Sequence, residues 1–178
     1  MLLYSRTSFN CDEEGKIIGD DSVENKKLKI CFAASSGGHL EELMVLRPLM
    51  ERYDSFIVTE QTKHEAAGSK DRIYYLMQVN RLEKACILRL IANSFLSLKI
   101  LLTKRPDIII TTGVLAIIPL CLLCKALGKK LIFIESYANV YSPTKTGRFL
   151  YWFADQFYVQ WPELMAYYPK ATYLGGIY

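Results

Sequence analysis

The sequence predicts an α/β fold, a Rossmann-like parallel sheet flanked by helices. From residue 28 onward, short apolar runs alternate with helical stretches, which is the pattern of a parallel α/β sheet. The longest apolar run, from Ile108 to Cys124, carries no charge over 17 residues, as is typical of strands buried on both faces. We expect strands near residues 28–35, 55–60, 72–78, 107–112, 130–136 and 156–160, and helices near 39–52, 82–104, 114–127, 145–154 and 162–168.

Length and charge divide the chain into one domain, residues 28–178, and a short extension. The 178 residues suffice for one domain with a real core. Residues 1–27 carry six acidic and four basic residues with little periodicity, which predicts a polar, mobile extension outside the fold. The remainder carries 18 Lys and Arg against 12 Asp and Glu, and 51% of the chain is hydrophobic. This balance favours an anionic membrane surface or a phosphorylated ligand over nucleic acid, for which the sequence has no motif.

The first expected strand runs into a small-residue turn that opens a helix. Backbone N–H groups at a helix start favour anions, and glycines let a phosphate approach the backbone closely. The turn lacks the Lys-Ser/Thr pair of a P-loop and the glycine spacing of a dinucleotide fingerprint. An ordinary strand-to-helix turn, with glycines present for packing, is the alternative. The turn consists of Ser35, Ser36, Gly37 and Gly38.

Two later strands also end in small or polar residues. Because ligands of open α/β sheets bind at the carboxyl ends of strands, we expect these ends and the first turn to form one crevice. A phosphorylated ligand is expected there. The candidate binding residues are Ser35, Ser36, Gly37, Gly38, Thr112, Gly113 and Ser136.

Three side chains are candidates for catalysis. His39, in the first helical turn, has the pKa range of a general base, although it could equally orient the acceptor. Glu42 lies one turn later and could hold His39, or it could be a solvated acid that complements the helix dipole. Glu135 ends an apolar strand, so its carboxylate is expected to face the crevice. The second histidine, His64, lies in a polar loop and is expected to be solvated.

The expected helix 82–104 has more apolar residues than one buried stripe requires. Ile87, Ile91, Leu98 and Leu102 can face the sheet, which leaves further leucines among basic residues. Such a surplus fits a helix that lies in the headgroup region of a bilayer, or one that contacts another helix or subunit. The expected membrane-facing residues are Arg81, Leu82, Lys84, Arg89, Leu90, Leu96, Lys99 and Leu101.

A second apolar segment, residues 108–124, reaches the lower length limit of a spanning helix. Its Thr-Thr-Gly sequence and Pro119 instead divide it into a buried strand and a helix. The five cysteines and the absence of a signal peptide favour a reducing, cytosolic compartment. Cys121 and Cys124 form a CxxC pair among leucines, which indicates buried small hydrophobes and not a zinc or redox site. We expect no metal site and no cofactor.

Several ordered blocks between residues 28 and 176 are similar to one glycosyltransferase family. The loop Ser36-Gly37-Gly38-His39 with Glu42 resembles its SGGHxxE motif. The other blocks are Phe133-Ile134-Glu135-Ser136 with residues 142–147, which resemble FxES…SxTG, residues 154–164, which resemble ADxFxVQWPEL, and the ending Tyr168-Pro169 with Leu174-Gly175.

These blocks resemble the family of subunit fourteen of the asparagine-linked glycosylation pathway, with bacterial capsule and exopolysaccharide proteins of the PssD and CpsF type. The resemblance implies the amino-terminal half of a GT-B glycosyltransferase, separated from its donor-binding half. A weaker similarity extends to MurG, whose single chain carries both halves. Eukaryotic members have an amino-terminal transmembrane anchor. Residues 1–27 are too polar for that role, which favours the bacterial type and peripheral attachment to the cytoplasmic face of the cell membrane.

The expected function is that of a membrane-associated subunit of a two-component hexosyltransferase in capsule or exopolysaccharide biosynthesis. The resemblance implies that it presents a polyprenyl-diphosphate-linked sugar acceptor and recruits a donor-binding partner subunit, without which it is inactive. Sugar transfer in a cleft needs a donor wall and an acceptor wall, and one α/β layer of this length supplies one. The alternatives are a self-sufficient nucleotide-sugar-dependent transferase and a soluble phosphate-binding α/β module.

Overall fold

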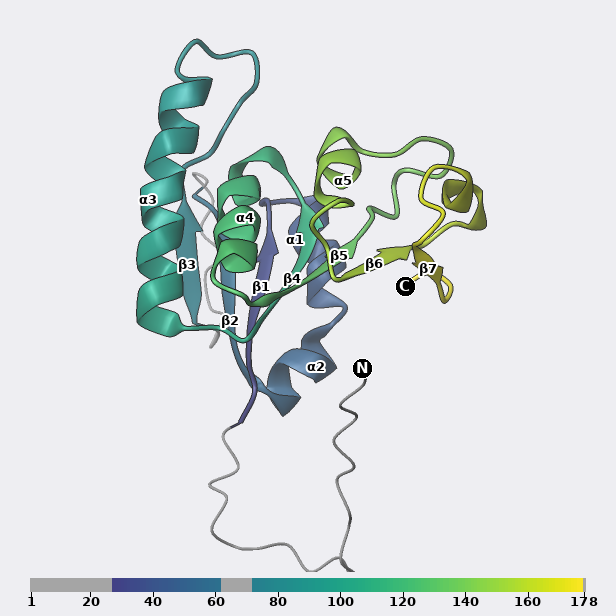
Figure 1. The fold of residues 1–178 in the computed structure, drawn as a ribbon, viewed down its shortest axis with the longest axis horizontal. Coiled ribbons are helices and arrows are strands. Elements are labelled where there is room, and N and C mark those ends of the chain that lie inside the picture. The colour runs from purple at the N-terminus through teal and green to yellow at the C-terminus, as the bar shows by residue number, and fades with distance from the viewer. Residues whose placement is uncertain (1–26, 62–71, 178) are drawn as a thin grey trace, which may run out of the picture.

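Seven parallel strands form one sheet in the computed structural model, which describes residues 27–61 and 72–177 (Figure 1). The spatial order is β3-β2-β1-β4-β5-β6-β7, and every neighbouring pair is parallel. All the predicted strands are confirmed, and β7 is an addition. The bounds are β1 Lys29–Ala34, β2 Asp54–Glu60, β3 Ile73–Leu76, β4 Ile108–Gly113, β5 Lys130–Ile134, β6 Gln156–Val159 and β7 Thr172–Tyr173.

Each predicted helical segment is found, although the one at 82–104 begins at Cys86, the one at 145–154 ends at Leu150, and the one at 114–127 starts with a 3₁₀ turn. Two others differ more. The expected helix 39–52 is two helices, because Pro48 has no N–H for the carbonyl of Met44. The expected helix 162–168 is a short 3₁₀ helix. The bounds are α1 Gly38–Met44, α2 Arg47–Arg52, α3 Cys86–Lys104, η1 Leu115–Ile117, α4 Ile118–Ala126, α5 Lys145–Leu150 and η2 Pro162–Ala166.

The chain reverses its direction across the sheet between β1 and β4. It adds β2 and β3 on one side of β1, crosses back through α3, and continues from β4 to β7 on the other side. The carboxyl ends of β1 and β4 therefore form a topological switch point, where ligands of open α/β sheets bind. The small-residue turn, residues 35–38, follows β1 at this point.

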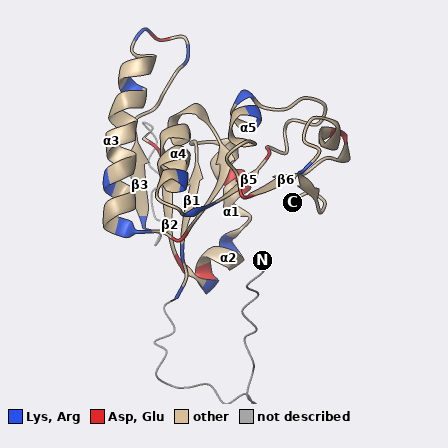
Figure 2. Ribbon diagram, in the orientation of Figure 1, with Lys and Arg blue, Asp and Glu red and all other residues tan. Residues whose placement is uncertain are grey.

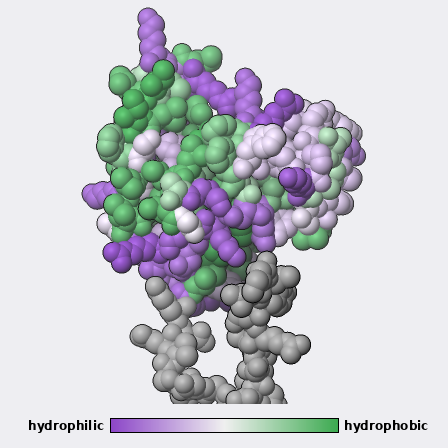
Figure 3. Space-filling model, in the orientation of Figure 1, coloured by the Kyte–Doolittle hydropathy of each residue, from purple (hydrophilic) through white to green (hydrophobic). Residues whose placement is uncertain are grey.

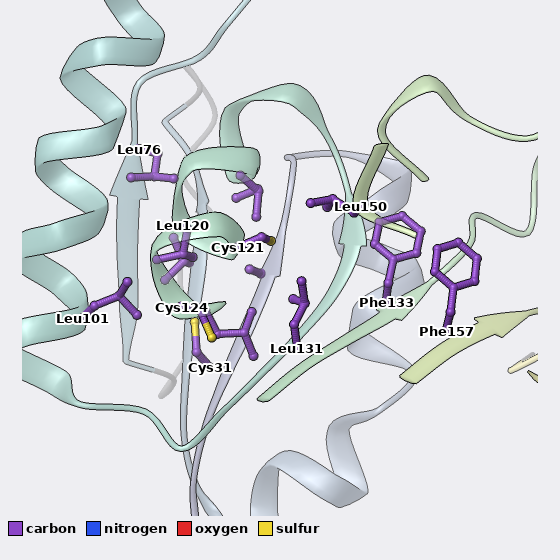
Figure 4. Packing of buried hydrophobic residues seen from close by; sticks show 14 of the residues in the cluster. Cys31, Leu76, Leu101, Leu120, Cys121, Cys124, Leu131, Phe133, Leu150 and Phe157 are labelled. Carbon is purple, nitrogen blue, oxygen red and sulfur yellow. The ribbon is translucent and has the colours of Figure 1, made fainter. Parts of the chain in front are cut away.

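The core has one apolar cluster on each face of the sheet. On one face, α1 and α2 cover a cluster that contains Phe32, Leu43 and Ile134. On the other, α3 and α4 lie side by side over a larger cluster that includes Leu101 and Leu120 (Figures 1 and 4). Residues 108–124 are thus β4, η1 and α4, which confirms the predicted division into a buried strand and a helix.

Three cysteines belong to this larger cluster. Cys31, Cys121 and Cys124 are fully buried (Figure 4). Burial raises the pKa of the Cys31 and Cys121 thiols far above the ordinary value, and it raises the pKa of Cys124 to about 12. Protonated thiols are poor nucleophiles and poor metal ligands. The prediction that the CxxC pair serves as small hydrophobes in the core is confirmed.

The orientation of α3 differs from the prediction. Ile87, Ile91 and Leu102, which were expected to face the sheet, are exposed, whereas Ile100 and Leu101 are buried. The helix is turned so that the buried Asn93 amide bonds both backbone groups of Met77 after β3, its Nδ2 to the carbonyl and its Oδ1 from the N–H, each at 2.8 Å. These two hydrogen bonds fix which side of α3 meets the sheet. The apolar residues on the opposite side of the helix are therefore exposed to solvent.

Two sequence-based expectations lie outside the described residues. The predicted polar extension covers residues 1–27, of which the structure describes Lys27 alone. The histidine predicted to be solvated, His64, lies within residues 62–71.

Candidate active site at the switch point

The turn after β1 is built around Gly37, which caps the start of α1. Its φ of +84° is a conformation that favours glycine. Its carbonyl accepts hydrogen bonds from the N–H groups of Leu40, at 2.9 Å, and Glu41, at 3.0 Å. A Cβ added to Gly38 would meet nothing within 4 Å. Packing therefore does not require the second glycine, and the space over it is open to a ligand.

His39 stands beside this open space with its backbone and its ring both oriented. The Thr112 hydroxyl, at the end of β4, donates to the His39 carbonyl at 3.1 Å. The imidazole is about one third exposed, and its Nδ1 is buried without a hydrogen-bond partner among the described residues. That nitrogen faces Glu42 Oε2 at 3.7 Å, beyond hydrogen-bond length. Nδ1 thus points to a carboxylate inside the protein, which leaves Nε2 for the pocket.

Glu42 is 3% exposed, so it is not the solvated acid of the alternative interpretation. Its Oε1 accepts hydrogen bonds from the backbone N–H of Tyr137, at 2.7 Å, and from the Gln160 amide Nε2. Its Oε2 is the oxygen that faces His39. A buried carboxylate needs such donors. The arrangement places a buried carboxylate oxygen opposite the imidazole, 3.7 Å from its Nδ1.

Glu135 does not face the crevice, and that expectation was wrong. The side chain is 0% exposed. Because side chains alternate along a strand, Glu135 points to the same side as Phe133, under α5. Its Oε2 accepts a hydrogen bond from the Tyr168 hydroxyl at 2.6 Å, and its Oε1 one from the N–H of Ser136 at 3.1 Å. Burial and this carboxylate raise the pKa of Tyr168, which keeps the phenol protonated as the donor.

The contact with Glu135 also explains the glycine of the SxTG block. A Cβ on Gly147 would collide with Glu135 Oε2 and lie 2.8 Å from the Tyr168 hydroxyl. Glu135 therefore connects the end of β5 to the segment after η2 and lies against α5. Its carboxylate does not face the site.

A pocket of about 390 Å³ lies between the turn after β1 and the segment after β5. Of the predicted binding residues, Gly38 and Ser136 line it together with His39 and Glu42. Thr112 and Gly113 are buried away from it, since the Thr112 hydroxyl holds His39 and the Gly113 N–H bonds Thr111 Oγ1. Ser35 is buried and Ser36 half-buried in the turn. The pocket lining is Gly38, His39, Glu42, Ser136, Tyr137 and Ala138.

A larger cavity, of about 600 Å³, lies at the start of β6. Tyr151, Trp152 and Lys170 contribute to its wall. No predicted site residue lines it. Within residues 27–61 and 72–177, no three His, Cys, Asp or Glu side chains come together as metal ligands.

Sequence reasoning missed two buried polar residues of this region. Gln160 follows β6 and bonds Glu42. Glu60 ends β2, and its Oε1 accepts from the N–H of Val79 at 3.2 Å. Burial raises the pKa of Glu60, and that hydrogen bond and the nearby His39 oppose the rise. Both are polar residues at the end of an apolar strand, the signal that selected Glu135, so the same rule could have found them.

A second candidate surface is the outward stripe of α3. Exposed apolar residues are spaced three, four or seven positions apart along one side of the helix, and no charge lies between Arg89 and Lys99. Figure 2 shows basic residues toward the two ends of this helix, and Figure 3 shows apolar surface along it. By length and composition α3 could also cross a membrane. The stripe consists of Ile87, Leu88, Ile91, Phe95 and Leu102.

The predicted membrane-facing residues differ in how far they are exposed. Arg81, Lys84, Leu96 and Lys99 are exposed, and Leu82 is 93% exposed. Arg89 and Leu90 are half-buried. Leu101 was wrong, because it is 3% exposed and lies in the core cluster under α3.

Comparison with known proteins gives both a family and a fold. A family model described as "Oligosaccharide biosynthesis protein Alg14 like" matches residues 30–177. The human UDP-N-acetylglucosamine transferase subunit ALG14 is 27% identical in an alignment of 186 positions. The alignment covers 88% of this chain and 86% of the human protein. The Schizosaccharomyces pombe subunit is 41% identical over 75 residues, 39% of this chain and 36% of that protein.

Solved structures with the same fold are longer proteins. Acinetobacter baumannii MurG superposes with a TM-score of 0.64 at 17% identity, over 76% of this chain and 42% of MurG. A UDP-N-acetylglucosamine 2-epimerase from Rickettsia bellii gives 0.64 at 11% identity, over 85% of this chain and 45% of the epimerase. The chain thus spans less than half of these structures. The predicted fold, equivalent to one half of a GT-B enzyme, is confirmed.

Proposed function

Because the chain belongs to the Alg14-like family of oligosaccharide biosynthesis proteins, we propose that it is the acceptor-side subunit of a two-component glycosyltransferase. The observation that carries the proposal is a pocket formed by a single Rossmann-like sheet. It lies at the switch point, and its described lining comes from the start of α1 and from residues 136–138 after β5. A donor-binding subunit would supply the opposite wall.

His39 is the general base of the proposed reaction. An acceptor hydroxyl gives its proton to Nε2 as its oxygen bonds the anomeric carbon of the donor sugar, and the bond from that carbon to the nucleoside diphosphate breaks. The diphosphate leaves with the electron pair. Glu42 Oε2, which faces Nδ1, then lies beside the imidazolium.

The acceptor is a polyprenyl-diphosphate-linked sugar in this proposal. Its diphosphate lies over the turn of Ser35, Ser36, Gly37 and Gly38, with Ser136 across the pocket. The open space over Gly38 supports this position. Thr112 holds the His39 carbonyl and Gly113 bonds Thr111 Oγ1, so the proposal places neither of them against the ligand.

The outward stripe of α3 provides the membrane contact of the proposed subunit. Burial of an isoleucine, leucine or phenylalanine side chain contributes about 1.5–3 kcal/mol, and basic residues at a helix end add attraction to anionic lipid. Arg81 and Lys84 before α3 and Arg105 at its end are exposed and are suited to contact headgroups. We propose peripheral attachment at the cytoplasmic face, where nucleotide sugars are made.

UDP-N-acetylglucosamine is the donor to test first, since the human and Schizosaccharomyces pombe relatives are subunits of transferases of that name. The relatives described above are eukaryotic. Capsule or exopolysaccharide synthesis of the PssD and CpsF type is therefore a separate, finer proposal that depends on the source of the chain.

The test is transfer of labelled sugar from UDP-N-acetylglucosamine to a polyprenyl-diphosphate sugar. The chain is assayed alone, with a candidate donor-binding subunit, and as a His39→Ala variant with that subunit. The proposal predicts product only with both subunits, and a loss of about 100-fold or more in the variant. Product from the chain alone would instead establish a self-sufficient transferase. Undiminished turnover by His39→Ala would refute the assignment of the base.

A further inference from the structure

Gln160, the residue that follows β6, has every polar side-chain atom engaged. It is buried, and its Nε2 donates to Glu42 Oε1 and, at 2.9 Å, to the carbonyl of Glu135. Its Oε1 accepts a hydrogen bond from the backbone N–H of Ile177 at 3.0 Å. One amide thus connects α1, the end of β5 and the segment after β7.

These partners fix which way the amide points. Ile177 presents an N–H, which requires the amide oxygen, and Glu42 and Glu135 present oxygens, which require the NH₂ group. The flipped amide would place oxygen against a carboxylate. The orientation of the Gln160 amide is therefore set by Glu42, Glu135 and the backbone of Ile177 together.

The consequence for the site is a Glu42 carboxylate that cannot turn freely. Tyr137 and Gln160 both donate to Oε1, which leaves Oε2 opposite His39 Nδ1. A neutral imidazole carries its proton on one nitrogen, and a facing carboxylate favours that proton on Nδ1. The Nε2 lone pair is then available to an acceptor hydroxyl in the pocket.

We propose that Gln160 is a positioning residue that holds Glu42 toward His39 and so selects the Nδ1–H tautomer of His39. The catalytic consequence rests on the proposed function, whereas the tautomer does not. Displacement of Ile177 reaches His39 through the same amide.

Nitrogen NMR of the histidine rings tests the tautomer directly. The chain has two histidines, so a His64→Gln background leaves the signals of His39 alone. We expect the neutral ring to carry its proton on Nδ1 in that background, and a shift toward Nε2–H in Gln160→Met, which keeps the side-chain length but removes the amide. Asn93→Met is the matched control, because it removes a buried amide on the other face of the sheet and leaves the tautomer unchanged.

A second pair of variants keeps Gln160. Ile177→Pro removes one of the three groups that orient the amide, the N–H that donates to Oε1, and Ile177→Val retains it. We expect a partial tautomer shift in the proline variant and none in the valine variant. An Nδ1–H signal that survives in both Gln160→Met and Ile177→Pro would overturn the proposal, and if Gln160→Met does not fold, the proline variant decides.

Measurements of transfer activity distinguish a failure of this proposal from a failure of the proposed function. In the two-subunit assay, Gln160→Met should lower kcat about 10-fold or more with little change in the acceptor KM, less than the loss from removing the base. A changed tautomer with unchanged kcat would leave the positioning role intact and refute the base.

Discussion

Two apolar helices, α3 and α4, lie side by side on the same face of the sheet and use their apolar residues in opposite ways. In α4, Leu120, Cys121 and Cys124 are fully buried. In α3, Ile87 is 71% and Phe95 70% exposed, while Asn93 and Ser97 are fully buried. A high content of apolar residues therefore does not tell which side of a helix meets the core. A buried polar residue with a fixed partner can decide it.

The contrast also separates stability from binding. The inward residues of α4 contribute to the free energy of unfolding, because burial removes them from water. The outward stripe of α3 contributes nothing of that kind in the isolated chain, and it costs solubility. An exposed apolar surface of this kind marks a site of interaction with a membrane or a partner.

The largest expected effect is on the α4 side of the comparison. Leu120→Ala should lower the free energy of unfolding by about 2–5 kcal/mol, because it leaves a cavity in the core cluster. Phe95→Ala in α3 should change it by no more than about 0.5 kcal/mol. Urea denaturation of both variants measures the difference. Equal losses would mean that the two helices are packed alike and would end the comparison.

A smaller loss is expected at the residue that orients α3. Asn93→Leu removes both hydrogen bonds to Met77 and leaves backbone groups without partners, which should cost about 1–3 kcal/mol. Hydrogen exchange should rise at Met77 more than at Leu131 in the middle of the sheet. A variant as stable as the native chain, with Met77 still protected, would show that Asn93 does not determine the orientation.

The smallest effect concerns the end of α4, where Lys125 pairs with Asp155 at 2.6 Å on the surface. Burial of Asp155 would raise its pKa, but the hydrogen bonds from Lys125 and the Leu131 N–H lower it below the ordinary value. Since the pKa of Asp155 is lower in the folded state, its contribution is present above the unfolded value of about 3.9 and is lost as the pH falls through the folded value.

Asp155→Asn should therefore flatten the decline of stability with acid, and it should change stability at pH 7 by about 1 kcal/mol or less from the exposed ion pair. Thermal unfolding between pH 7 and pH 2 measures this. An unchanged slope on the acid side would contradict the role assigned to Asp155.

Most of the architecture was predictable, because strands and helices of a parallel sheet are coded locally. Apolar runs ended at Ala34, Gly113 and Ile134, close to the predicted ends. The period of the α3 stripe was also correct. The direction of the stripe was not, because it depends on the contact between Asn93 and Met77, sixteen residues apart.

The candidate site was predictable in part for the same reason. His39 and Glu42 are one helical turn apart, so their proximity follows from local geometry. Gln160 lies 118 positions from Glu42 in the sequence, and only the folded sheet brings the two side chains together. Glu135 was assigned to the crevice from its place at a strand end, but the alternation of side chains turned it to the opposite side.

Binding to vesicles tests the claim that the outward face of α3 is the membrane surface. Co-sedimentation with anionic phospholipid vesicles compares the native chain, an Ile91→Glu/Phe95→Glu variant, and Leu127→Glu, which adds a charge at an exposed leucine outside the stripe. We predict binding by the native chain and by Leu127→Glu. The double variant should bind at least about 100-fold more weakly, at about 1.5–3 kcal/mol per lost side chain. Equal binding by all three proteins, or no binding by the native chain, would contradict the account.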